Sequence, residues 1–547
     1  MKQITRHILS LVLTCAMLLS LLPAVALAEE PENTPNTAAD TLADPAPVNE
    51  PAGEPTQKVY VSADGNDTTG TGASDNPYAT LQKAVSTALD GATVYVMTDL
   101  TINQLARITD KHLTITSVDP AQPVTLTRGS VRGADNNQSH YNSAMIEVTT
   151  VASEDSDNAS SVTLTSIILD DAGKHDGTYF AQTNMEIEEN TEGNLGFVQD
   201  SMVTAHGKGN RAVNIVLGDG AVLKDYGGMS AVYGTTNAHI TMLTGSKITA
   251  PNVTDRVKSS SKPPKDETGA AGAVWLQGAE FIMNDGAEIC DMVGRAVYAD
   301  SGTAIINGTI SDISSDADMW QGKGGVAVHV RNKANVTFGS TALFDNSNVS
   351  AKIDSAVYVN QGSFEMVDGS KICNLAGTAV QGYGSKTQPA GSINITIDGE
   401  ICGIIDGGNA INLNESGGLY CKIGPNADIH HNTVWAATLY AQGPGIVIDL
   451  YGTIRDNTST QYSAGIWLAN NFNGAKLTMY GNAKITGNTS VNEGAAVIVS
   501  EGTFTMNGGI ISGNYSHTKS LAGGVSVRRN GTFIMNGGEI TGNTVSD

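Results

Sequence analysis

Several kinds of residue are scarce in this chain of 547 residues, and each scarcity excludes a class of protein. Lys and Arg number 31 against 55 Asp and Glu, so the formal net charge is −24. A chain this acidic is poorly suited to nucleic acid or anionic membrane surfaces, and we expect neither partner. Only five Cys are present, too few for a disulfide framework in a chain of this length.

Several motifs are also missing. Calcium-binding repeats of the Gly-Gly-x-Gly-x-Asp type do not occur, and no Cys or His residues have the short spacing of a structural metal site. We therefore expect no cofactor and no bound metal; the negative charge permits Ca²⁺ binding, but no motif supports it. The Leu-x-x-Leu-x-Leu pattern of leucine-rich repeats is absent as well.

The N-terminus has the three parts of a secretory signal peptide over residues 1–28. Lys2 and Arg6 form the basic start, residues 8–22 form the apolar run, and Ala-Leu-Ala at 26–28 is a small-x-small cleavage site. The run is short for a membrane span of about 20 residues. We expect cleavage, no transmembrane segment in the mature chain, and export from a bacterial cell.

Residues 29–57 are acidic and proline-rich, which predicts a disordered linker with little apolar surface to bury. The next segment, residues 58–97, contains two alternating strand patterns around Thr80–Leu89. In that segment apolar residues recur at helical spacing, which predicts a short amphipathic helix. Such a helix would cover the open end of a stack of coils.

A 13-residue unit recurs near the end of the chain. Residues 502–514 read Gly-Thr-Phe-Thr-Met-Asn-Gly-Gly-Ile-Ile-Ser-Gly-Asn, and residues 531–543 repeat ten of these identities. A fixed period of this kind is typical of a solenoid. Related units, each with three short strands and glycine-rich corners, extend over residues 211–547, interrupted by a predicted protruding loop at 250–270. The prediction is an all-β, right-handed parallel β-helix, because parallel crossovers are almost always right-handed.

Two resemblances accompany this pattern. The C-terminal units are similar to the surface repeats of exported, adhesin-like bacterial proteins, which implies a secreted or cell-surface protein. Residues 58–97 resemble the start of pectin-lyase-like right-handed β-helix proteins, a fold shared by polysaccharide lyases, hydrolases and non-enzymatic surface proteins. The positions that carry this second resemblance are Tyr60, Val61, Gly65, Asp67, Gly72, Pro77, Thr80, Leu81, Ala84, Ala88, Gly91 and Val94–Val96.

One asparagine recurs three residues after the last strand's Ile in six coils. We expect these side chains to point inward at a corner and to form a stacked ladder that satisfies backbone groups of the turn. The ladder comprises Asn346, Asn432, Asn457, Asn488, Asn514 and Asn543.

One outward position in the first strand of each coil is rich in aromatic residues, although aromatics make up only 5% of the chain. Exposed Tyr and Trp rings stack on sugars and anchor protein partners, so this column predicts a binding face for a polysaccharide or a host-surface glycan or protein. The alternative is that the rings only shield neighbouring strands. The aromatic members are Tyr233, Trp275, Tyr298, Tyr358, Tyr440 and Trp467, and the others are Asn214, Ala327, Gln381, Asn412, Ile498 and Ser526.

Two further groups could carry chemistry. Cys373 and Cys402 occupy equivalent positions in successive coils, where either a disulfide or two stacked thiols would fit. Asp170 and Asp171, with His175 nearby, could supply the two carboxylates that glycoside hydrolysis needs, but a solvated turn after Leu169 is the preferred interpretation. The Asn-Thr-Asp, Gly-His-Gly and Arg-Ile-Lys motifs of polygalacturonase-like hydrolases are absent.

We therefore expect a monomeric, secreted or cell-surface β-helix that binds glycans or host surfaces and has no catalytic activity. The alternatives are a polysaccharide-degrading enzyme, pectate lyase-like or polygalacturonase-like, and a structural stalk. The chain stops at Asp547 directly after a repeat unit, so we also expect the natural protein to continue.

Overall fold

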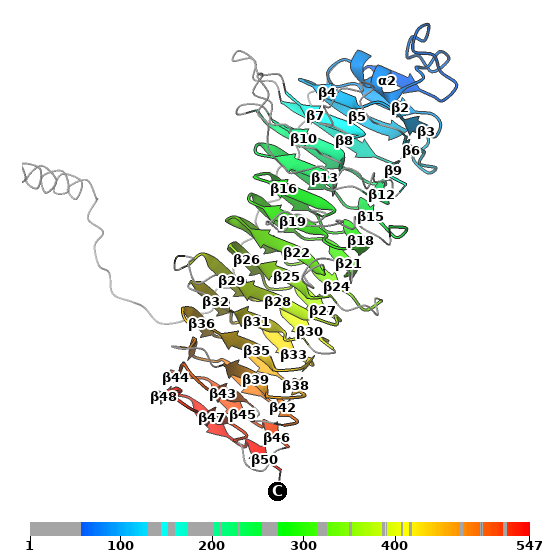
Figure 1. The fold of residues 1–547 in the computed structure, drawn as a ribbon. Helices are drawn as coiled ribbons and strands as arrows, with labels where there is room; N and C mark the ends of the chain where they lie inside the picture. Colours follow the sequence, from blue (N-terminus) through cyan, green and yellow to red (C-terminus); the bar gives the residue numbers. More distant parts are fainter. Residues whose placement is uncertain are drawn as a thin grey trace, which may run out of the picture. The chain divides into compact units, whose positions relative to one another are not determined.

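Parallel strands stacked coil upon coil make up nearly all of the fold (Figure 1). The structure is a computed structural model that describes residues 56–129, 144–150, 159–172, 201–207, 211–227, 230–253, 272–315, 325–348, 353–384, 389, 391–405, 408–414, 418–469, 474–492, 494, 496–517 and 522–546. Within these residues the strands form sheets of 16, 15 and 14 strands, and successive strands along each sheet come from successive coils. The predicted parallel β-helix is therefore confirmed.

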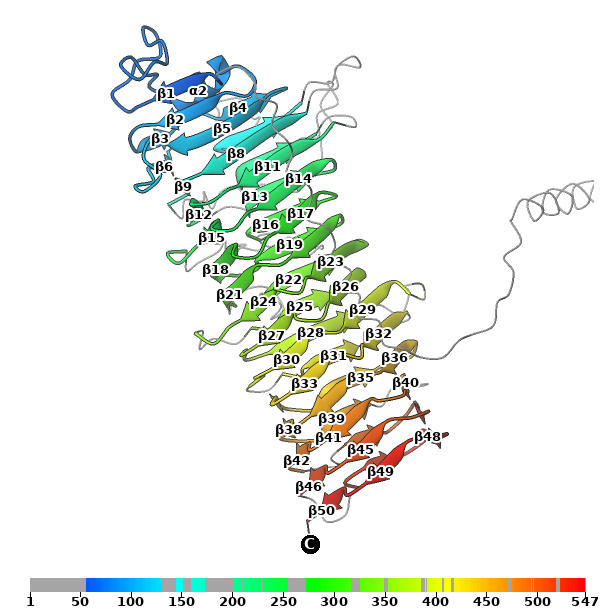
Figure 2. The same ribbon diagram turned by 180° about the vertical axis from the view of Figure 1, so that it is seen from behind.

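The 14-stranded sheet carries the column of outward residues. Figure 2 shows the same coils from the side opposite to that of Figure 1. Its strands are β4 (Ala106–Thr109), β7 (Ile146–Thr149), β10 (Ser201–His206), β13 (Ser230–Thr235), β16 (Val274–Gln277), β19 (Val297–Asp300), β22 (Val326–Arg331), β25 (Ser355–Val359), β28 (Thr378–Tyr383), β31 (Ile411–Asn414), β35 (Ala437–Gln442), β39 (Ser463–Leu468), β43 (Val497–Val499) and β47 (Val525–Val527).

The 16-stranded sheet runs from β1 (Lys58–Val61) to β48 (Thr532–Met535), and the 15-stranded sheet from β3 (Leu100–Ile102) to β49 (Glu539–Thr541). Strands in both sheets alternate between buried and exposed residues, as in β36 (Ile446–Leu450). Inward side chains of one type stack between coils, and the rings of Phe504 and Phe533 lie 5.0 Å apart. Like residues meet because the ladders pair equivalent positions in register.

Helix α2 (Leu81–Thr87) lies at the N-terminal end of the coils (Figure 1). Thr80 caps it by accepting a hydrogen bond from the Lys83 N–H. Leu81, Ala84 and Val85 are buried, so the helix covers the first coil with its apolar face. The helix ends at Thr87, two residues before the end of the predicted segment; Ala88 is still buried, whereas Leu89 is 64% exposed.

The six ladder asparagines lie at one corner of the coils, five of them buried and Asn543 partly exposed. Each links neighbouring coils: the Asn457 Nδ2 donates to the Ile429 carbonyl at 2.9 Å and to the Asn488 Oδ1 at 2.9 Å. The Asn488 Oδ1 also accepts from the Asn457 N–H at 3.1 Å. Directly after the last five ladder positions, a small sheet forms from β34 (Thr433–Val434), β38 (Thr458–Ser459), β42 (Thr489–Ser490), β46 (Tyr515–Ser516) and β50 (Thr544–Val545).

No helix among the described residues has the length and apolar character needed to span a membrane. The predicted signal peptide, nearly all of the predicted linker and most of the predicted loop at 250–270 fall outside the described residues. Those three assignments stay predictions.

Candidate functional site

The outward column of the 14-stranded sheet differs from the predicted one at two coils. His329, not Ala327, pairs with Tyr298 and Tyr358. The segment Val-Ala-Val-His-Val has two equivalent alternations, and only pairing with the neighbouring coils selects between them. Asn214 belongs to β11 (Val213–Leu217) of the 16-stranded sheet, and Thr204 holds its place beside Tyr233.

The N-terminal part of the column is closed. Its five rings touch in sequence, with centroid separations of 4.5, 6.4, 5.2 and 5.0 Å. The rings are 0%, 8%, 4%, 2% and 4% exposed, in the order Tyr233, Trp275, Tyr298, His329 and Tyr358. Strands about 4.8 Å apart bring each ring against the next, so no ring face is left for a ligand. The prediction that Tyr233, Trp275, Tyr298 and Tyr358 form an exposed binding face is wrong.

Charged side chains surround the Tyr298 ring in the closed part. The Arg331 Nη1 donates to the Tyr298 hydroxyl at 2.9 Å, and Arg331 also lies 3.3 Å from the Asp300 carboxylate. Arg295 lies 5.0 Å above the centre of the Tyr298 ring. Burial raises the pKa of Tyr298, so this phenol stays neutral at physiological pH. The closed part has the features of a core.

The C-terminal part of the column is open. Gln381, Asn412, Tyr440 and Trp467 succeed one another in register, and all four are partly exposed. Two amides here separate the closed run of rings from the next pair of rings. Among the column positions from Tyr233 to Trp467, these four are the ones that reach solvent.

Four rings gather in this open part, and we call them the open aromatic cluster. Tyr440 and Trp467 lie 5.1 Å apart, Trp467 stacks on Tyr462 at 4.3 Å, and Tyr462 meets Trp435 edge-on at 5.6 Å. Trp435 is 50% exposed and stands at the corner just before β35. The cluster spans two successive coils and presents an indole surface to solvent.

Amide groups border the open aromatic cluster. The Tyr440 hydroxyl donates to the Gln442 Oε1 at 2.7 Å, and the Asn414 Nδ2 donates to the Asn412 Oδ1 at 2.7 Å. The Trp467 Nε1 donates to the Ser500 Oγ at 3.1 Å. Within the described strands β28, β31, β35 and β39 there is no Asp, Glu, His, Lys or Arg. The surface of the open aromatic cluster therefore combines apolar rings with polar amide and hydroxyl groups, and the strands beneath it carry no charged residue.

Trp435 and Tyr462 were not predicted as site residues. Each precedes the outward residue that was counted in its coil by five residues and lies at the corner just before the strand. When the sequences of the coils are aligned by their strand residues, residues at the corners are not compared with one another. The signal that could have found them is an aromatic residue shortly before the strand in two successive coils.

The acidic pair does not form an open site. Asp171 is 1% exposed, forms an ion pair with Arg128, and accepts a hydrogen bond from the Gly227 N–H at 2.8 Å. Asp170 lies 3.4 Å from the Lys224 Nζ. Each carboxylate is thus matched by its own cation, which does not favour the glycosidase arrangement. His175 falls outside the described residues.

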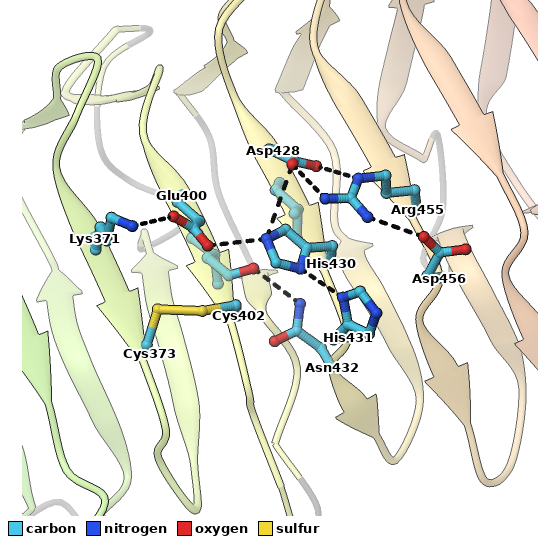
Figure 3. Close-up of polar contacts among 12 residues, drawn as sticks. Lys371, Cys373, Glu400, Cys402, Asp428, His430, His431, Asn432, Arg455 and Asp456 are labelled. Atoms are coloured by element: carbon cyan, nitrogen blue, oxygen red, sulfur yellow. Dashed lines mark hydrogen bonds and ion pairs between the residues drawn. A yellow bond between two sulfur atoms is a disulfide. The ribbon is translucent and has the colours of Figure 1, made fainter.

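The 15-stranded sheet carries a second group of polar side chains, which we call the disulfide cluster (Figure 3). Strands β27 (Lys371–Cys373) and β30 (Glu400–Cys402) pair in register, and the structure joins Cys373 to Cys402 in a disulfide with a Cα–Cα distance of 4.7 Å. The Lys371 Nζ lies 2.7 Å from the Glu400 carboxylate, and this hydrogen bond lowers the pKa of Glu400 although burial opposes it. The His430 Nε2 lies 3.0 Å from the same carboxylate.

Comparisons with known proteins leave the family open. No model of a known protein family matches the chain, and no curated protein matches it. Among solved structures, the chain is similar to a GH136 lacto-N-biosidase from Eubacterium ramulus, at 11% identity and a TM-score of 0.28 over 89% of this chain and 68% of that one. It is also similar to XylC in complex with xylose, at 10% identity and a TM-score of 0.29 over 90% and 86%. Scores this low carry no argument about function.

Proposed function

We propose that this protein binds a neutral glycan on the open aromatic cluster and does not cleave it. The observation that carries the proposal is a half-exposed Trp435 in contact with a chain of three further rings, beside side-chain amides. The C–H faces of sugar rings stack on aromatic rings, and sugar hydroxyls exchange hydrogen bonds with amides.

Charge supports a neutral ligand. A net charge of −24 repels polyuronates and other acidic glycans, and the four strands beneath the cluster supply no cation to offset this. Those strands also lack a carboxylate or imidazole that could act as a general acid or base, which favours binding over hydrolysis. A surface with neutral hydrogen-bonding groups suits neutral polysaccharides.

We further propose that binding takes place outside the cell, on a polysaccharide or a glycan of a host surface. The support for this part is the predicted signal peptide with its basic start, apolar run and Ala-Leu-Ala cleavage site.

The test is a Trp435→Ala variant, assayed by affinity electrophoresis and calorimetry on xylan, mannan and β-glucan, with polygalacturonate as the acidic comparison. We expect at least one neutral polymer to bind, and the variant to bind it about tenfold more weakly, a loss of about 1.4 kcal/mol.

The matched control is Tyr480→Ala, which removes a ring stacked on Tyr451 at 4.7 Å beside the 16-stranded sheet. This variant should bind like the wild type. Equal losses in both variants, or binding of polygalacturonate alone, would refute the proposal. Release of reducing ends from a bound polymer would replace it with the enzymatic alternative.

A further inference from the structure

The disulfide cluster lies on a different sheet from the open aromatic cluster and has its own chemistry (Figure 3). Glu400 and Cys402 are two residues apart on β30, so both side chains leave the same outward face. Cys373 is the in-register partner of Cys402 on the preceding coil. Stacking of coils therefore assembles three side chains whose positions in the sequence show no metal-binding spacing.

These three side chains converge at one point. One ligand atom from each, the two Sγ atoms and a Glu400 carboxylate oxygen, all lie within 4.8 Å of one another. Among the described residues this is the single group of three Cys, His, Asp or Glu side chains that meets this spacing. Zinc bonds of about 2.3 Å to sulfur and 2.0–2.2 Å to oxygen require only small side-chain shifts from such an arrangement.

The next coil supplies a partner for the carboxylate. His430 lies on β33 (Asp428–His430) and is in register with Cys402 of the preceding coil. The His430 Nε2 lies 3.0 Å from the Glu400 Oε1. Lys371 holds the other carboxylate oxygen at 2.7 Å. Side chains that orient a metal ligand in this way usually change metal affinity by about 10- to 100-fold.

We propose that reduction of the Cys373–Cys402 disulfide converts this cluster into a zinc site. A dithiol donates two electrons and two protons, the S–S bond breaks, and the dithiol itself becomes a disulfide. Zn²⁺ then displaces the two thiol protons and binds both thiolates and the Glu400 carboxylate, while water takes the fourth position. His430 and Lys371 act as positioning residues. The two states exclude each other, since one sulfur pair cannot serve both, and each state links the same two coils.

The experiment uses the full exported chain, reduced with a dithiol under nitrogen, desalted, and titrated with Co²⁺ as a spectroscopic probe before Zn²⁺ displacement. Reduced protein should bind one equivalent and show thiolate-to-cobalt charge-transfer absorption, whereas oxidised protein should not. Cys373→Ser should abolish that band, and Glu400→Gln should weaken binding by at least about 10-fold, because it removes a ligand. Cys290→Ser, at a buried free thiol, is the matched control and should bind like the wild type.

Two results would overturn the proposal: a reduced wild type without the charge-transfer band, or an undiminished band in Cys373→Ser. Metal bound equally by oxidised and reduced protein would show only adventitious binding to acidic surface groups, and also counts against it. A second measurement needs no variant. Zn²⁺ should protect Cys373 and Cys402 of the reduced wild type from alkylation, and a chelator should make both thiols reactive again. Unprotected thiols would again refute the site.

Discussion

Two parts of one sheet use the same outward position in opposite ways. In the closed part, Tyr298 is 4% exposed and lies between rings at 6.4 and 5.2 Å on the neighbouring coils. In the open part, Tyr440 has a ring on one side, Trp467, and the amide of Asn412 on the other. The same position of the coil thus holds a buried ring in one part of the sheet and a partly exposed ring in the other.

The two parts also differ in what stabilises them. The closed part is held by a continuous run of rings, whereas most of the asparagine ladder lies in the later coils, from Asn432 to Asn543. Each ladder amide bridges two coils at a corner, so it needs nothing from the outward column. The later coils are therefore linked at a corner that does not involve the outward column.

The largest expected effect is the difference in stability between alanine variants of two tryptophans, Trp275 and Trp435. Trp275→Ala should destabilise the fold by about 3–5 kcal/mol, because it removes a buried ring and leaves a cavity between two others. Trp435→Ala should change stability by about 0.5 kcal/mol or less, since its ring is half exposed. Thermal and urea unfolding followed by circular dichroism measure both. Comparable losses in the two variants would show that the open cluster is also part of the core.

The next effect tests the ladder. Asn488→Leu removes the acceptor for the Asn457 N–H and the donor to the Ile454 carbonyl, which lie 3.1 and 3.0 Å from Asn488. Each buried group left unpaired costs about 1–3 kcal/mol. We expect a clear fall in the unfolding midpoint with unchanged glycan binding.

Asn543→Leu, at the partly exposed last position of the ladder, is the control and should lose less stability. An unchanged unfolding midpoint in Asn488→Leu would show that the later coils do not depend on the ladder.

The smallest effect is a pH dependence. Burial raises the pKa of Tyr298 above its usual value near 10, so the folded state keeps this proton after the unfolded state has lost it. Its contribution to stability is complete below about pH 10 and is lost as pH rises further. Tyr298→Phe should flatten the fall in stability above about pH 10. Burial also raises the pKa of the less buried Tyr440, and Tyr440→Phe should flatten that fall less. Equal slopes in both variants would contradict the difference in burial.

The sequence predicted the fold because each coil repeats its own pattern. The Phe and Met positions of residues 502–514 and 531–543 align in the structure, with Phe504 paired to Phe533 and Met506 to Met535. Prediction was wrong where the pattern was degenerate, as at Ala327 and His329, since two residues of shift preserve the alternation. Trp435 was missed because corners vary in length between coils.

Sequence by itself determined the three-strand coils, the acidic surface and the identity of most residues in the outward column, because these follow from residue types and their local period. Only the tertiary structure decided which rings are buried and which are open, and only it brought Glu400 and His430 to the cysteine pair. Both outcomes depend on contacts between coils about 30 residues apart. Such contacts follow from the register of the stack, which no single coil encodes.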